Sequence, residues 1–278
     1  MNSNNGQARS WMKNLVDEAN DQTEAWSEYN RALVYGEFGV GKTRFCGVPD
    51  VFIFDYDDGL TTLRKSGKVP PTVQFRQEQP IYEPTMQVIS DLQKRSGPFS
   101  KDGVLGKTRL IALDGITALA ELLMHEISRD IIGEHKDITA FKPQFDEWGI
   151  LKKRLNEVIE GLKLCPYHLV VTAMSKFEQD SATKAYVGGI DILGSYRNTI
   201  SRRFDEVWYV EKRRASNSER EATGSEIAND FYLNYHPRFP VKSRLSSDES
   251  LGIPNKVPNP TWDTLVKPLY RKRGGWEA

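Results

Sequence analysis

The sequence predicts an α/β fold with a mainly parallel sheet flanked by helices on both faces. The first three short, continuous apolar runs each end at a glycine or an aspartate, and segments with helical periodicity follow the same alternation along the chain. This alternation is typical of strands that are buried on both faces and joined by crossover helices. In such a sheet, functional side chains are expected at the carboxyl ends of the strands.

The individual elements follow from these patterns in chain order. Apolar runs predict strands over 31–36, 51–55, 109–114 and 167–174, and two further runs, 205–213 and 230–237, are candidates for a hairpin. Helical spacing predicts a short helix after the glycines of 36–43 and longer helices over 10–29, 116–132 and 147–164. Proline and glycine predict loops at 68–87, 94–108 and 175–199, with a short helix between the first two. We expect an N-terminal extension, partly helical, over 1–29, a domain over 30–250 and a C-terminal tail over 251–278.

Composition limits the possible partners. The 278 residues contain 38 Lys plus Arg and 38 Asp plus Glu, so a polyanion would need a local basic patch rather than a global field. Cys46 and Cys165 lie outside any CxxC pattern, and the four histidines have no metal-ligand spacing. No apolar run approaches the ~20 residues that span a bilayer. We therefore expect a cytoplasmic protein without a membrane partner, located in the host cytoplasm if a phage encodes it.

One motif carries specific chemistry. Residues 36–43, GEFGVGKT, satisfy the pattern GxxxxGK[ST], with a strand before it and a helix after it. Lys42 is expected to reach the β- and γ-phosphates of a nucleotide and Thr43 to bind Mg²⁺, unless the match is a coincidence. The nucleotide-binding residues predicted from this P-loop are Gly36, Glu37, Phe38, Gly39, Val40, Gly41, Lys42, Thr43 and Arg44. A second Gly-Lys-Thr at 106–108 precedes a strand and has Lys101 where the first glycine belongs, so a loop is expected there.

Acidic residues follow two of the predicted strands. Asp114 ends the third apolar run and is expected to bind Mg²⁺ with Thr43, although an aspartate here can also cap the next helix. Asp55, Asp57 and Asp58 cluster after the second run, where a base would orient an attacking water. Because clustered carboxylates repel one another unless a cation or a proton intervenes, one or two of them are expected near the metal or the phosphate, with a surface turn at 57–59 as the alternative.

The order of these motifs resembles that of the RecA-like P-loop ATPases. The pieces are the P-loop, FDYDDGL, LIALDGITAL, DEWGILKKRL, VVTAMSK and RRFDEVWYV, over about residues 30–245. They are most similar to a phage-encoded branch with an AAA domain that includes Sak-type single-strand annealing proteins. Three positions depart from that family: Gly115 replaces serine, Asp57 replaces the glutamate that activates water, and Met174 replaces a histidine of the sensor strand.

The resemblance implies roles for further residues. It implies catalytic roles for Lys42, Asp57 and Asp114 and sensor roles for Thr172, Ser175 and Lys176. It places DNA contacts in the loop after the sensor strand, where the candidates are Lys176, Lys184, Tyr186, Arg197, Arg202 and Arg203, with Tyr196 as a further ring; a solvated loop is the alternative. Lys242 and Arg244 are candidates for contacts to a neighbouring subunit's nucleotide, or for a surface salt bridge. Assembly into a ring or filament is implied by the resemblance alone.

Together these features predict a function. We expect ATP binding and Mg²⁺-dependent hydrolysis coupled to single-stranded DNA binding, in phage-type recombination or single-strand annealing. One alternative is an ATP-binding module with weak or no hydrolysis, which the departures at Asp57 and Met174 favour. Another is a P-loop kinase acting on a small molecule, although the sequence shows neither an arginine-bearing lid nor an acceptor pocket.

Overall fold

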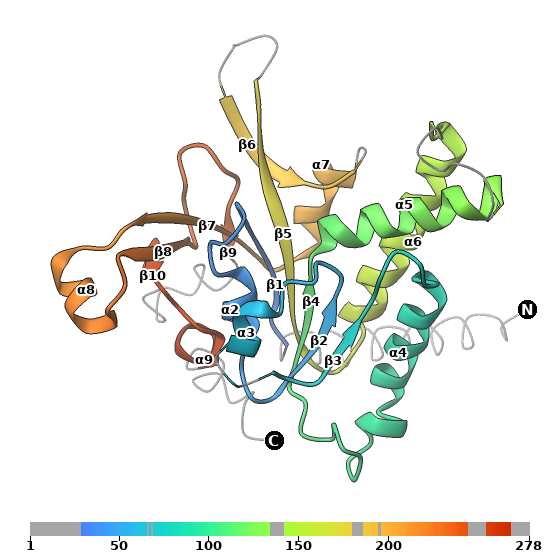
Figure 1. The fold of residues 1–278 in the computed structure, drawn as a ribbon, viewed down its shortest axis with the longest axis horizontal. Coiled ribbons are helices and arrows are strands. Elements are labelled where there is room, and N and C mark those ends of the chain that lie inside the picture. Colours follow the sequence, from blue (N-terminus) through green and yellow to red (C-terminus); the bar gives the residue numbers. More distant parts are fainter. Residues whose placement is uncertain are drawn as a thin grey trace, which may run out of the picture.

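The computed structural model describes residues 29–65, 67, 69–133, 142–179, 186–193, 196–243 and 254–267. These residues form a ten-stranded sheet in which the main path runs β10-β8-β7-β1-β5-β4-β2-β3 (Figure 1). The pairs from β7 to β3 along this path are parallel, and the pairs that involve β6, β8, β9 and β10 are antiparallel. The predicted α/β class with a mainly parallel sheet is therefore confirmed.

The strands and helices have the following bounds. The strands are β1 Arg31–Gly36, β2 Val51–Asp55, β3 Thr72–Gln74, β4 Leu110–Asp114, β5 His168–Gln179, β6 Tyr186–Asp191, β7 Glu206–Arg214, β8 Ile227–Tyr232, β9 Lys242–Ser243 and β10 Lys256–Pro258. The helices are α2 Lys42–Cys46, α3 Thr61–Lys65, α4 Tyr82–Lys94, α5 Ile116–Ile132, α6 Phe145–Lys163, α7 Arg197–Ile200, α8 Asn217–Thr223 and α9 Trp262–Leu265, with short 3₁₀ turns at η1 Gly97–Phe99 and η4 Ser201–Arg203.

Helices cover both faces of the sheet. Successive residues of a strand point to opposite faces, so each central strand contributes side chains to two cores. In β1, Leu33 and Tyr35 join the core beneath α4, α5 and α6, while Ala32 and Val34 join the core beneath α2, α3 and α9. All six residues of β1 are buried. A strand covered on both faces carries an unbroken apolar run, which is why β1 could be recognised from sequence.

The order of the strands brings the glycine loop and the acidic strand ends to one edge. β5 lies between β1, which leads into the glycine loop, and β4, which ends at Asp114. β2 pairs with β4 so that Asp55 lies directly opposite Asp114. Since these strands are parallel, their carboxyl ends meet on the same side of the sheet, as the sequence predicts.

The expected loop over 175–199 is wrong in its first part. β5 continues to Gln179 and pairs with β6 in an antiparallel hairpin, which extends beyond the rest of the sheet in Figure 1. Two glycines in β6 remove the alternating pattern that would have marked a strand. Gly188 is required there because a Cβ would lie 2.1 Å from the ring of Phe239.

The expected loop over 68–87 is also partly wrong, because it contains β3 and the start of α4. α4 has 13 residues and begins at Tyr82, with Pro84 in its first turn, where the missing N–H of proline costs no helical hydrogen bond. The second Gly-Lys-Thr, in contrast, lies in turns before β4 as predicted. The helix predicted over 10–29 falls, apart from its last residue, outside the described residues.

The segment expected to form a C-terminal tail contributes to the sheet and to its core. β10 pairs with β8, and Trp262 at the start of α9 is 0% exposed. The Trp262 ring lies 5.9 Å from that of Phe45 in α2 and 5.7 Å from that of His168. Residues 254–267 therefore pack behind the helix that follows the glycine loop.

In the part of the chain that the structure describes, no helix has both the length and the apolar character needed to cross a membrane.

Candidate nucleotide-binding site

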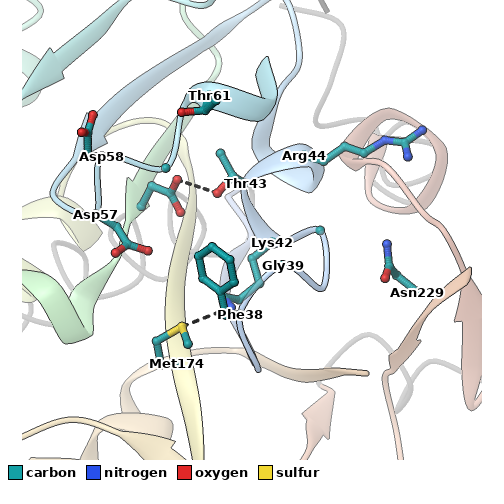
Figure 2. A pocket seen from close by; sticks show the side chains of 13 residues that line it. Phe38, Gly39, Lys42, Thr43, Arg44, Asp57, Asp58, Thr61, Met174 and Asn229 are labelled. Carbon is teal, nitrogen blue, oxygen red and sulfur yellow. Dashed lines mark hydrogen bonds between the residues drawn. The ribbon is translucent and has the colours of Figure 1, made fainter. Parts of the chain in front are cut away.

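A cavity of about 580 Å³ opens at the carboxyl ends of β1, β2 and β4 (Figure 2). The glycine loop and the start of α2 form its floor. One wall carries the strand-end acids, and residues from β5 and β8 complete it. Its lining residues are Phe38, Gly39, Gly41, Lys42, Thr43, Arg44, Asp57, Asp58, Gly59, Thr61, Asp114, Met174 and Asn229.

Lys42 lies at the floor of this cavity and is 9% exposed. Its Nζ donates to the carbonyl oxygens of Gly36, at 2.9 Å, and Glu37, at 2.7 Å. Burial lowers the pKa of Lys42 to about 8, and the carboxylates of Asp114 and Asp57 oppose this shift. An anion placed beside a lysine desolvated in this way stabilises its charged form.

Asp114 is held by two hydroxyl groups. The Oγ1 of Thr43 donates to Asp114 Oδ2 at 2.8 Å, and the Oγ1 of Thr172 donates to Asp114 Oδ1 at 2.6 Å. Thr172 also accepts from the backbone N–H of Gly115 at 2.8 Å. Burial raises the pKa of Asp114, and the two hydroxyl donors and Lys42 counteract that rise. Thr172, predicted as a sensor, thus orients the acid rather than facing the cavity directly.

Two further acids lie near Asp114, one at the end of the neighbouring strand β2 and one in the turn that follows it. Asp55 is fully buried, and its Oδ1 accepts the backbone N–H of Gly59 at 3.3 Å, which holds the turn that carries Asp57. The other oxygen of Asp55 has no partner among the described residues. Burial and the neighbouring Asp114 raise the pKa of Asp55 to about 6. Asp57 is exposed at the cavity, and desolvation followed by the charge of Asp114 raises its pKa.

Gly115 brings the turn of Asp57 close to the end of β4. Its φ is +93°, and a Cβ on it would lie 2.7 Å from the Cβ of Asp57. A serine in this conformation would be strained and would displace Asp57. The departure from the family at Gly115 is therefore matched to the local backbone.

The residues of the predicted sensor strand point to different faces. Met174 lines the cavity, and its sulfur lies 3.5 Å from Lys42 Nζ. The Nζ of Lys176 lies 3.7 Å from the Oδ1 of Asp191 in β6. Because side chains alternate along β5, Ser175 points away from the face that carries Thr172 and Met174, and its buried hydroxyl has no partner among the described residues.

The other predicted nucleotide-binding residues differ in exposure. Glu37, Gly39 and Arg44 are exposed, and Phe38 is 81% exposed, whereas Val40 is buried in the core beneath α2. The Val40 side chain therefore packs in the core and does not line the cavity.

The structure also brings Asn229 and Lys212 to the glycine loop, which the sequence did not predict. The two are paired in register on β8 and β7. The Lys212 ammonium lies 2.9 Å from the position of a Cβ on Gly39, and the Asn229 amide nitrogen lies 3.0 Å from that of a Cβ on Gly41. No motif marks either residue, because only the antiparallel pairing places this part of the chain beside the loop.

The predicted DNA-contact residues do not share one surface. Lys176 and Tyr186 belong to the β5–β6 hairpin, although nothing is described of the Tyr186 side chain, and Lys184 lies outside the described residues. Arg203 pairs with Glu160, and exposed Arg202 lies beside it at the opposite, amino end of the strands. Arg197 begins α7, the short helix that follows β6 and precedes η4 in the chain. Tyr196 is 2% exposed, so its ring is covered and cannot stack on a base.

Lys242 lies at this same amino end. It belongs to β9, which pairs with the first residues of β7, and its Nζ donates to the Phe204 carbonyl at 2.6 Å. The glycine loop of the same chain lies beyond the opposite end of the strands. Arg244 is outside the described residues.

Comparison with known proteins assigns the chain to a family. A model of the AAA domain matches residues 28–245. The chain belongs to the AAA domain family. No curated protein sequence matches this AAA domain protein. Its P-loop, its sheet and its flanking helices together form an α/β P-loop NTPase fold.

Two solved structures that resemble this AAA domain protein have low identity. The RadB recombinase is 14% identical, with 77% of this chain and 85% of that chain covered and a TM-score of 0.41. A KaiC-like protein from the hyperthermophilic archaeon Pyrococcus horikoshii OT3 is 12% identical, with 77% of this chain and 82% of that chain covered and a TM-score of 0.35.

The residues of the cavity fit a nucleoside triphosphate and a magnesium ion. Lys42, which here binds the carbonyl groups of its own loop, is the cation suited to phosphate oxygens. Thr43 Oγ1 and the Asp114 carboxylate provide oxygen ligands, which Mg²⁺ prefers. The unpaired oxygen of Asp55 lies on the neighbouring strand end and leaves a second buried acceptor close to that pair.

Proposed function

We propose that this AAA domain protein binds ATP with Mg²⁺ and hydrolyses it. The observation that supports this most directly is the arrangement of Lys42, Thr43 and Asp114 around one cavity, since Thr43 and Asp114 are joined by a 2.8 Å hydrogen bond. Bound magnesium would neutralise phosphate charge during phosphoryl transfer. Lys42 would stabilise the charge that develops on the phosphate oxygens, and Thr172 would keep Asp114 in position.

Asp57 is the residue proposed to orient the attacking water. It lines the cavity and carries a raised pKa, which brings a carboxylate closer to the range useful for a general base. An aspartate reaches less far than a glutamate, so slow hydrolysis is expected. A module that binds ATP with little turnover is the second candidate, and the position of Met174 against Lys42, where a histidine could have relayed a polar contact, favours it.

We further propose that turnover is coupled to single-stranded DNA, in phage-type recombination or annealing of the Sak type. The support is the β5–β6 hairpin, which extends beyond the rest of the sheet (Figure 1). Its first strand contains both the cavity residue Met174 and Lys176. Lys176, Lys184 and Tyr186 combine cations with an aromatic ring, as strand-tracking surfaces do. Arg197, Arg202 and Arg203 are proposed as a second set of phosphate contacts away from the hairpin.

Assembly into a ring or filament is also part of the proposal. Lys242 cannot reach the cavity of its own chain, because it is bound to Phe204 at the amino end of the strands. A contact by Lys242 or Arg244 to nucleotide would therefore have to occur in a neighbouring subunit. Lys242→Ala is then expected to lower turnover with little change in ATP affinity, which steady-state kinetics and ATP titrations would separate.

The experiment that tests ATP hydrolysis compares the two Gly-Lys-Thr lysines. ATPase rates are measured with and without single-stranded DNA for wild type, Lys42→Ala and the matched control Lys107→Ala, which changes an exposed lysine remote from the cavity. We expect Lys42→Ala to lose about 100-fold or more in turnover and Lys107→Ala to lose none. Equal rates for the two variants would contradict the site. Absent turnover with retained ATP binding would favour the binding module.

The DNA contact is tested by the anisotropy of labelled oligothymidylate over a range of salt concentrations. A Lys176→Ala, Lys184→Ala double variant should bind more weakly and show a salt slope smaller by about 1 to 2 than wild type, because fewer counterions are released. Lys107→Ala, which changes an exposed lysine outside the proposed contacts, is the control and should leave the slope unchanged. An unchanged slope in the hairpin variant would exclude the hairpin as the DNA surface.

A further inference from the structure

Asn229 lies at the end of the cavity opposite to the acids. In Figure 2, Asp57, Asp58 and Met174 lie on one side of the glycine loop, and Arg44 and Asn229 lie on the other. Lys42, Thr43 and Asp114 fix where the terminal phosphates would sit, and Asp57 marks the side from which water would attack. A nucleotide bound in this orientation directs its nucleoside toward Arg44 and Asn229.

The amide of Asn229 is available for a ligand. Its nitrogen faces the loop, 3.0 Å from the position of a Cβ on Gly41, and has no acceptor among the described residues. Its oxygen is buried and also lacks a partner within the described part of the chain. A half-buried amide whose nitrogen and oxygen have no partner among the described residues lowers stability unless a ligand or water binds it.

The backbone of Asn229 is held in place by the segment after β10. The N–H of Asn229 donates to the side-chain oxygen of Asn259 at 2.8 Å, and the N–H of Asn259 donates to the Asn229 carbonyl at 2.7 Å. Asn259 adopts a φ of +46°, which asparagine tolerates better than most residues. The reciprocal pair fixes the position of Asn229 next to the loop, while its side-chain amide stays free to bind.

We propose that Asn229 donates a hydrogen bond from its amide nitrogen to the ribose oxygens of the bound nucleotide, and that Asn259 positions it. This inference rests on the proposed nucleotide binding. Ribose presents hydroxyl and ring oxygens as acceptors, which suit an amide donor. Because this contact does not involve the base, it favours binding of a nucleoside triphosphate over bare polyphosphate. It does not distinguish ATP from GTP.

The test measures ATP, GTP and inorganic tripolyphosphate binding by isothermal titration calorimetry of the full chain. Asn229→Ala should weaken ATP and GTP binding alike, by about 5-fold, and should leave tripolyphosphate binding within about twofold of wild type. Asn217→Ala, an exposed asparagine on α8, is the matched control and should change none of the three.

A second variant separates positioning from folding. Asn259→Gly keeps the positive φ and removes the side-chain oxygen that holds Asn229, so ATP affinity should fall in the same direction by a smaller factor. An equal loss for tripolyphosphate in either variant would overturn the ribose contact, and a loss confined to ATP would assign the amide to the base. Lys42→Ala should weaken all three ligands. Absence of ATP binding in wild type would instead refute the proposed function itself.

Discussion

Trp262→Ala tests whether residues 254–267 belong to the folded core. The side chain of Trp262 is fully buried between Phe45 and His168. Truncating a buried tryptophan costs about 3 to 5 kcal/mol in transfer free energy and cavity formation. Its indole nitrogen has no partner among the described residues, so removing it relieves about 1 kcal/mol of desolvation. A net loss of roughly 3 kcal/mol is therefore expected.

Urea denaturation and thermal unfolding measure this loss. A change of roughly 3 kcal/mol corresponds to a decrease in Tm of about 6 to 12 °C for a domain of this size. Trp148→Ala is the matched control, because Trp148 is 36% exposed on α6 and should lose about 1 kcal/mol. If both variants lost the same small amount, the packing of α9 behind the glycine loop would be refuted.

Three further variants test the interior and the acids of the site. His168→Asn keeps an acceptor for the Asn30 N–H. Burial lowers the pKa of His168 to about 3, so this imidazole stays neutral in the folded state while the unfolded chain gains a proton below about pH 6.5. Between pH 7.5 and 5, wild type should therefore lose about 2 kcal/mol of stability relative to the variant, as measured by urea denaturation. Equal pH slopes would contradict this. Thr172→Val leaves Asp114 without one donor and should weaken ATP binding measurably in magnesium but not in EDTA; equal effects would exclude a role in metal binding. Gly115→Ala should cost about 1 to 3 kcal/mol of stability, seen as a lower denaturation midpoint, and wild-type stability would show that the positive φ is not required.

The parallel core could be predicted because its physical signals are local. The apolar run of β1 reflects burial on both faces, and the glycine loop and Asp114 end strands whose limits are visible in the sequence. The same logic predicts that Thr43 and Asp114 lie together, and the 2.8 Å hydrogen bond between them agrees with that prediction.

The parts that were missed depend on contacts between distant segments. The β5–β6 hairpin has no strand pattern because Gly188 must leave room for Phe239, which follows it by about fifty residues. Asn229 reaches the cavity through the pairing of β8 with β7 and through Asn259. Such positions are set by tertiary packing, and a window of neighbouring residues carries no information about them.

The position of residues 254–267 has a consequence for biosynthesis. The strand that leads into the glycine loop leaves the ribosome more than two hundred residues before Trp262, which supports that loop from behind. A nascent chain can therefore form β1, β4 and β5 early, yet Phe45 of α2 lacks its contact with Trp262 until α9 has emerged. The helix that follows the glycine loop is therefore fully packed only late in translation.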